Sequence, residues 1–175
     1  MKSLHGTART IPDRTGRIVT YRAIALGDIG RLERFHKELS PQTVWQRYSS
    51  VVPLHTRIEL KRLERQCSID EYHSFAVVAL HDDHLLGVGR FTRTGNQSGE
   101  VAFVVRDTDQ AKHIGKELVR SLLAWIEEHF HDSTLTLTAQ CMATNERMRS
   151  LLVSSGFQII PGRDHRVTTA RRVLR

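Results

Sequence analysis

The spacing of hydrophobic and polar residues predicts a strand followed by three helices in the first part of the chain. Residues 18–24 alternate as a half-buried strand does, and Asp28 stands where it can cap the N-terminus of a helix. Ser40 precedes a proline, which predicts a second helix with serine as its cap and proline in its first turn. Thr56 and Glu59 have the spacing of a capping box and predict the start of a third helix. The apolar residues of these helices recur at helical spacing: Ile29, Leu32, Phe35 and Leu39, then Val44, Trp45 and Tyr48, then Leu60, Leu63 and Cys67.

Three strands are expected next, over residues 73–80, 85–92 and 100–106. Short polar or glycine-containing segments, 81–84 and 94–99, separate them. Such connections are too short for a crossover helix, so the three strands should pair as antiparallel hairpins.

The strongest helical pattern covers residues 111–130, where apolar residues recur every three or four positions. A strand over 134–139 follows, and then a helix that begins near Asn145 and that Gly156 should end. Further strands are expected from Phe157 and over 165–170. This order predicts an α/β fold, in which a mixed sheet carries helices on both faces.

Composition and length favour one folded domain. Hydrophobic residues make up 39% of the 175 positions and charged residues 26%. We expect residues 1–16 to form a flexible N-terminal tail and 17–175 a single domain. The longest apolar run, 75–80, is far shorter than a membrane span. Residues 1–16 lack the apolar core of a secretory signal, and the two cysteines do not form a CxxC pair, so we expect reduced thiols in a cytoplasmic protein.

The net charge of +7 favours an anionic ligand or partner, but does not separate nucleic acid from a phosphorylated cofactor. Arginines cluster over residues 163–175 without the interleaved aromatic residues of a base-stacking platform, so a solvated or substrate-facing surface is the better interpretation. The His81-Asp-Asp-His84 segment is explained as a hairpin turn, and His129 and His131 as cations near a helix C-terminus. No metal site is expected.

The start of the long helix is the first candidate site. The strand over 100–106 leads into a loop that opens this helix, where unpaired N–H groups and the helix dipole can bind phosphate. Lys112 and Lys116 oppose that dipole, which an anion between them would explain. Ordinary solvated lysines are the alternative.

Four segments in register resemble the GNAT superfamily of N-acetyltransferases. The segment Gln110-Ala-Lys-His-Ile-Gly115 is similar to the loop with which the family binds the pyrophosphate of acyl-CoA, and Asn145 through Gly156-Phe157 is similar to a second family element. Residues 39–48 (LSPQTVWQRY) and 68–79 resemble segments of the catalytic domain of bacterial protein lysine acetyltransferases. The resemblance covers about residues 18–160 and implies a GNAT-type fold with a mostly antiparallel central sheet.

The same resemblance implies which residues bind acetyl-CoA. Backbone groups at Val104 and Val105 should face the acyl group and the pantetheine arm, and Asn145 either bonds that arm or only begins its helix. His113 replaces the first glycine of the family's loop, and Leu152 stands where many members carry a tyrosine acid. The phosphate-binding residues would be Gln110, Ala111, Lys112, His113, Ile114, Gly115 and Lys116.

The resemblance implies transfer of an acetyl group from acetyl-CoA to a primary amine, with a protein lysine favoured. Glu100 is the candidate base, because it begins the strand before the loop, where many family members that acetylate lysine hold a glutamate. Strand alternation puts it on one face with Ala102 and Val104, an apolar surrounding that would raise its pKa. A solvated glutamate is the alternative.

Two other classes of function stay open from the sequence. One is a catalytically impaired acyl-CoA-binding or interaction module, supported by His113 and Leu152. The other, less favoured, is a nucleic-acid-binding domain that uses the positive charge. The residues do not decide the acceptor or the oligomeric state.

Overall fold

The computed structural model describes residues 8–70, 72–130, 134–160 and 164–174. The strands are β1 (Arg9–Pro12), β2 (Ile18–Ala23), β3 (Ser74–His81), β4 (His84–Gly95), β5 (Ser98–Val105), β6 (Leu135–Met142), β7 (Gln158–Ile160) and β8 (Val167–Leu174). The α-helices are α1 (Ile29–Glu38), α2 (Pro41–Tyr48), α3 (Leu54–Arg57), α4 (Leu60–Cys67), α5 (Ile114–His129) and α6 (Glu146–Ser154). Two 3₁₀ turns, Leu26–Asp28 and Asp107–Asp109, precede α1 and α5.

These strands form one sheet in the order β1-β2-β3-β4-β5-β6-β8-β7. All neighbouring strands are antiparallel except β5 and β6, which run parallel. The predicted hairpins β3-β4 and β4-β5 are confirmed, as is the mixed, mostly antiparallel α/β sheet.

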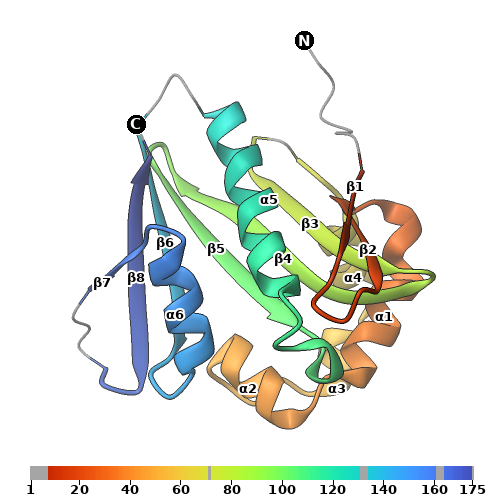
Figure 1. Cartoon of the computed structure of the whole chain (residues 1–175). Helices are drawn as coiled ribbons and strands as arrows, with labels where there is room; N and C mark the ends of the chain where they lie inside the picture. Colours follow the sequence, from red (N-terminus) through yellow and green to blue (C-terminus); the bar gives the residue numbers. More distant parts are fainter. Residues whose placement is uncertain (1–7, 71, 131–133, 161–163, 175) are drawn as a thin grey trace.

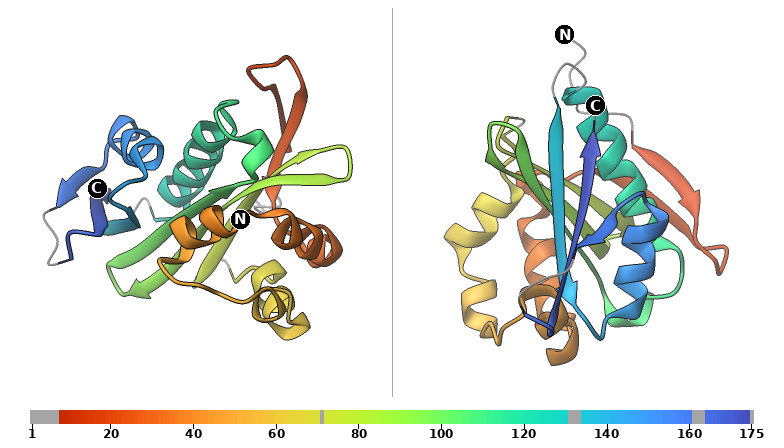
Figure 2. Two further views of the ribbon diagram at one scale, coloured as in Figure 1. Left: turned by 90° about the horizontal axis from the view of Figure 1, so that it is seen from below. Right: turned by 90° about the vertical axis from the view of Figure 1, so that its left-hand side faces the viewer.

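Helices cover both faces of the sheet, α5 and α6 on one and α1, α2 and α4 on the other (Figures 1 and 2). Alternate residues of β3 enter different cores: Phe75 packs under α5, whereas Val78 packs with α1 and α4. The Phe75 ring stacks on Trp125 of α5 with centroids 3.8 Å apart. Both faces of the central strands are therefore apolar, which explains the unbroken apolar run at 75–80.

The parallel strands β5 and β6 stay together over only part of their length. Their register runs from Ser98 opposite Thr136 to Glu100 opposite Thr138. Beyond Glu100 the two strands diverge, and α2 contacts both of them below the opening (Figure 1). The backbone groups that a continuous sheet would pair are therefore directed into the gap.

The beginning of the chain differs from the expected tail. Residues 9–12 form β1, which pairs with β2 along the edge of the sheet, and a turn at Gly16 joins the two strands. The first residues of the expected tail, 1–7, lie outside the described residues. Strand β1 was missed because four residues carry too short a pattern to show alternation.

Two helix boundaries in the first half also differ from expectation. The capping box at Thr56 and Glu59 is wrong: Thr56 lies inside the one-turn helix α3, and Glu59 precedes a separate helix α4. Asp28 does occupy the N-cap position of α1, but its side chain makes no capping bond to this helix and accepts from the Ala25 N–H of the preceding 3₁₀ turn at 2.9 Å. Its carboxylate binds Arg22 and Arg31 instead, at 2.7 and 3.0 Å.

The later helix ends agree better with the sequence. Ser40 caps α2 by accepting a hydrogen bond from the Thr43 N–H at 3.1 Å, as the serine-proline pair predicts. Helix α6 ends before Gly156, whose φ of 85° is in the left-handed region. The strand expected over 165–170 is β8, and it runs on to Leu174.

Candidate active site

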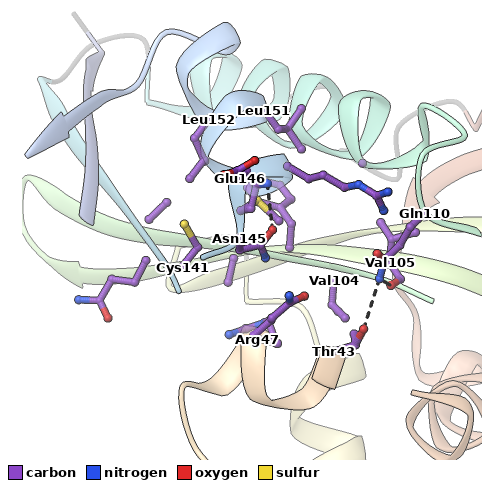
Figure 3. Close-up of a pocket in the computed structure, with 18 of the residues that line it drawn as sticks. Thr43, Arg47, Val104, Val105, Gln110, Cys141, Asn145, Glu146, Leu151 and Leu152 are labelled. Carbon is purple, nitrogen blue, oxygen red and sulfur yellow. Dashed lines mark hydrogen bonds between the residues drawn. The ribbon is translucent and has the colours of Figure 1, made fainter. Parts of the chain in front are cut away.

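A cleft of about 530 Å³ opens where β5 and β6 diverge. Residues 101–105 of β5 and 139–141 of β6 form its floor, and α2, α6 and the loop before α5 form its walls (Figure 3). A volume of this size lies within the range of roughly 300–1,000 Å³ that small-molecule sites occupy.

The floor of the cleft presents a backbone donor that pairs with no strand in the described part of the sheet. The Arg106 N–H donates to the Leu86 carbonyl of β4 at 2.8 Å. Because backbone groups alternate along a strand, the Val105 N–H points away from β4, toward the side that β6 has left. By the same alternation, Val104 directs its backbone groups to β4, so it meets the cleft with its side chain. This corrects the expectation that both backbones face a ligand.

Two residues of the loop before α5 have left-handed backbone conformations. His113 is the N-cap residue of α5 with φ 70°, and Ala111 has φ 61°. Both values lie in the left-handed region that glycine favours. His113 therefore takes up a backbone conformation that glycine favours, and the first N–H groups of α5 lack intrahelical partners.

The residues expected to bind phosphate divide by position. Gln110, Ala111 and Gly115 line the cleft, whereas the Ile114 side chain is buried in the core and only its backbone can face a ligand. Lys116 is exposed outside the cleft lining. The Lys112 ammonium binds the Asp109 carboxylate at 3.3 Å, so its charge already has a partner.

A network of buried charges holds this loop against the first hairpin. Asp109 accepts from Arg17 at 2.7 Å and from Arg106 at 2.6 Å. Burial raises the pKa of Asp109, but these hydrogen bonds outweigh it and hold the pKa below its usual value. Asp13 likewise has its pKa lowered to about 2, because bonds from Thr15 and Arg17 outweigh its burial. The β1-β2 hairpin therefore fixes the loop.

A second set of bonds ties α2 to the same loop. Asp107 accepts from the Ser40 N–H and hydroxyl at 3.0 and 2.6 Å, and from the Thr43 hydroxyl at 2.7 Å. Gln110 donates to Thr43 at 3.3 Å and to the Val105 carbonyl at 3.2 Å (Figure 3). The sequence showed that Ser40 caps a helix, but no local signal connects it with Asp107, 67 positions away.

Glu100 lies at the edge of the cleft, where β5 and β6 are still paired. It is exposed and does not line the cleft, although Ala102 and Val104, which follow it on the same face, do. The expected apolar surrounding is therefore not observed. Glu100 instead interacts electrostatically with the guanidinium of Arg47 in α2.

The α6 side of the cleft carries Asn145, Leu152 and, from β6, Cys141 (Figure 3). The Asn145 Oδ1 caps α6 by accepting from the Met148 N–H at 3.1 Å, which leaves its amide nitrogen to face the cleft. Leu152 is fully buried. Burial raises the pKa of the Cys141 thiol, so this sulfur stays protonated.

Other sequence candidates fall outside the cleft. Within the described residues, no three histidine, cysteine or acidic side chains come together as a metal site would require. Asp83 of the histidine-containing turn binds Arg31 and Arg34. No helix in the described part of the chain has the length and apolar character to cross a membrane. His131, Arg163 and Arg175 lie outside the described residues.

Comparisons with known proteins agree with this geometry. The family model of the acetyltransferase (GNAT) domain matches residues 19–158. The GNAT domain of S. lividans PAT superposes with a TM-score of 0.79 at 19% identity, over 95% of this chain and 97% of that one. A comparison with curated proteins finds no match.

Two further solved structures share the fold at lower identity. Ribosomal-protein-S5-alanine acetyltransferase from Vibrio fischeri has a TM-score of 0.73 at 12% identity, with 96% and 97% of the two chains covered. PaiA N-acetyltransferase from Thermoplasma acidophilum, solved with coenzyme A, has a TM-score of 0.69 at 13% identity, with 88% and 98% covered. The family match spans most of the chain and includes both strands of the open cleft, so this protein belongs to the GNAT acetyltransferase family.

Proposed function

We propose that this protein transfers the acetyl group of acetyl-CoA to the ε-amine of a protein lysine, with Glu100 as the general base. Acetyl transfer to an amine is the activity of the family. The cleft between β5 and β6 is the observation that carries the proposal to this chain, because a free N–H on its floor and the helix-start loop at its end suit a thioester and a phosphate.

The binding steps follow from the described contacts. The pyrophosphate would lie at the first turn of α5, where the left-handed His113 exposes backbone N–H groups. The pantetheine arm would run along β5 toward Asn145 of α6. The Val105 N–H would donate to the thioester carbonyl, and such a donor stabilises the negative charge that develops on that oxygen.

Proton removal is the main chemical demand. At pH 7 a lysine amine with a pKa of about 10.4 is almost entirely protonated. Forming the neutral amine, which is the nucleophile, therefore costs about 4.6 kcal/mol. Glu100, exposed at the edge of the cleft, can accept the proton through a water molecule. The amine nitrogen then bonds to the carbonyl carbon and gives its second proton to water, the carbon–sulfur bond breaks, and coenzyme A leaves as its thiolate.

The test is acetylation of lysine peptides by the wild-type protein and by Glu100→Gln. We expect Glu100→Gln to lower kcat about a hundredfold or more, since a general base contributes about 10²–10⁴. Acetyl-CoA affinity, measured by calorimetry, should not change. Glu33→Gln, on the exposed face of α1, is the matched control and should keep full activity. Equal rates for Glu100→Gln and wild type would exclude Glu100 as the base.

One observation favours a second candidate, an acyl-CoA-binding module without catalysis. The position where many family members carry a tyrosine acid is the fully buried Leu152, which cannot protonate a leaving thiolate. The two functions separate in one experiment. The module binds acetyl-CoA but releases no thiol with any amine, whereas the transferase does both.

A further inference from the structure

The wall of the cleft that α2 forms carries an arginine with no ion-pair partner among the described residues. Arg47 lines the cleft and is half-buried (Figure 3). Its guanidinium lies 5.0 Å from the centre of the Tyr48 ring. Among the residues that the structure describes, no carboxylate lies within ion-pair distance of it.

A second arginine stands on the neighbouring strand. Arg90 of β4 lies opposite Ala102 of β5, so its side chain shares the face of the sheet that α2 covers. It is half-buried and donates to the Gln66 carbonyl at 2.7 Å, again with no carboxylate partner in the described part of the chain. Burial lowers the pKa of both guanidinium groups, and the positive charge of Arg47 lowers the pKa of Arg90 further.

Negative charge on this wall is scarce. Glu100 interacts with Arg47 but is exposed, and Arg62 adds another positive charge nearby. The other carboxylates of the lining lie elsewhere. Asp107 is occupied by Ser40 and Thr43, and Glu146 belongs to α6 across the cleft, beside Arg147. The wall therefore has an excess of positive charge next to the proposed base.

We infer that the acceptor is a lysine within an acidic peptide segment, and that Arg47 binds an acidic side chain beside that lysine. This inference rests on the proposed function. An unpaired, half-buried guanidinium is stabilised by a carboxylate, which it can bind through two parallel hydrogen bonds. The same charge repels polycationic acceptors such as basic peptides or polyamines.

A phosphate of acetyl-CoA is the competing partner for Arg47. The helix start that suits phosphate follows Val105, at the far end of β5 from Glu100, whereas Arg47 and Arg90 interact with residues around Glu100 and Ala102. This placement favours the acceptor. The experiment must still measure acetyl-CoA affinity separately.

The experiment compares three peptides that carry one lysine flanked by aspartate, glutamine or arginine residues. Peptide dissociation constants are measured by calorimetry with saturating coenzyme A, which cannot react, and kcat/KM is measured with acetyl-CoA. At about 0.15 M salt the wild-type protein should bind the acidic peptide about tenfold or more tightly than the neutral one, as expected of a charge-assisted contact. The basic peptide should bind weakest.

Three variants locate the source of that preference. Arg47→Gln should abolish it, and Arg47→Lys should keep part of it, because lysine preserves the charge without the bidentate geometry. Arg9→Gln is the matched control: it removes one exposed positive charge from β1, at the far edge of the sheet from β6, and should keep the preference unchanged. Acetyl-CoA affinity should be equal in all four proteins.

Each contrary outcome has its own meaning. Equal binding of the three peptides by a protein that binds acetyl-CoA would overturn the inference. So would an equal loss in Arg9→Gln, which would assign the preference to net charge, or a loss of acetyl-CoA affinity alone in Arg47→Gln, which would assign Arg47 to a phosphate. Arg47-dependent binding of the acidic peptide without turnover would support recognition of an acidic segment by Arg47, but would overturn both the transferase and the acceptor role of that segment.

Discussion

The two ends of the cleft are built in opposite ways. At the loop end, buried charges are paired: Asp109 is surrounded by Arg17, Arg106 and Lys112, and Asp13 holds Arg17 from the other side. At the α2 end, Arg47 and Arg90 are half-buried without a carboxylate partner in the described part of the chain.

This difference suggests that the two ends do different things: the loop end positions the backbone, and the α2 end recognises the acceptor. At the loop end the charges are paired with one another and fix the backbone. The N–H groups of the loop are then left to bind acetyl-CoA, which is the same ligand in every reaction. Unpaired charges keep their electrostatic potential available, so at the α2 end they can select among ligands. The predictions below test this contrast, from the largest expected effect to the smallest.

Removing Asp109 should destabilise the loop end of the cleft, where the buried charges are paired. Asp109→Ala leaves three cations around an empty site, and the loss of one partner of a buried ion pair costs about 3–5 kcal/mol of unfolding free energy. Acetyl-CoA should also bind more weakly, because the loop loses its tie to the hairpin. Urea denaturation and calorimetry measure the two effects. Asp164→Ala, which removes an exposed carboxylate paired with Arg166, should change neither.

Acid should lower the unfolding free energy of the protein through His36, which lies near Arg47 at the α2 end of the cleft. Burial lowers the pKa of His36 to about 4, and Arg57, Arg62 and Arg47 contribute to this shift. Between pH 6.5 and 4 the unfolded chain binds a proton that the folded chain does not, so stability falls as the pH falls through this window. A shift from 6.5 to about 4 corresponds to roughly 3 kcal/mol.

Ring resonances in NMR spectra check this prediction directly. The His36 imidazole should stay neutral at pH 5 and titrate near pH 4, and denaturation at several pH values should show the loss of stability. His165→Gln, at an exposed position, is the control and should show the wild-type pH dependence. Titration of His36 near 6.5 would contradict the assignment.

The smallest effect concerns backbone strain in the loop. His113 holds φ 70°, which costs a residue with a Cβ about 1 kcal/mol. His113→Gly should raise the unfolding free energy by about 0.5 kcal/mol, because part of the relief is lost to the greater freedom of the unfolded chain. Acetyl-CoA affinity should stay equal or rise. Gly156→Ala, at φ 85°, should destabilise instead, and a stabilised alanine variant would contradict the strain argument.

Much of the fold could be predicted because local patterns and tertiary packing agree. The hairpins, the long amphipathic helix and the caps at Ser40 and Asn145 each depend on residues close in sequence. The capping box at Thr56 failed because Pro53 opens a separate turn of helix that contains Thr56. Strand β1 was missed because its stability comes from pairing with β2 rather than from its own pattern.

The candidate site was predicted in part for a similar reason. The loop at 110–116 could be located because strand, turn and helix follow one another in the chain. The partners of that loop could not, because Arg17, Ser40 and Thr43 are brought to it by the sheet and by α2 from distant positions. Arg47 appeared only as one letter of a resembling segment.

The sequence by itself determined the order of the strands from β2 to β6 and of the longer helices, the family resemblance and the loop that opens α5, because these depend on local spacing. Only the tertiary structure decided where β5 and β6 part, which charges are paired and which are left free. The physical reason is that an ion pair or a cleft depends on distances in space. Residues 67 or 92 positions apart meet only after the sheet has formed.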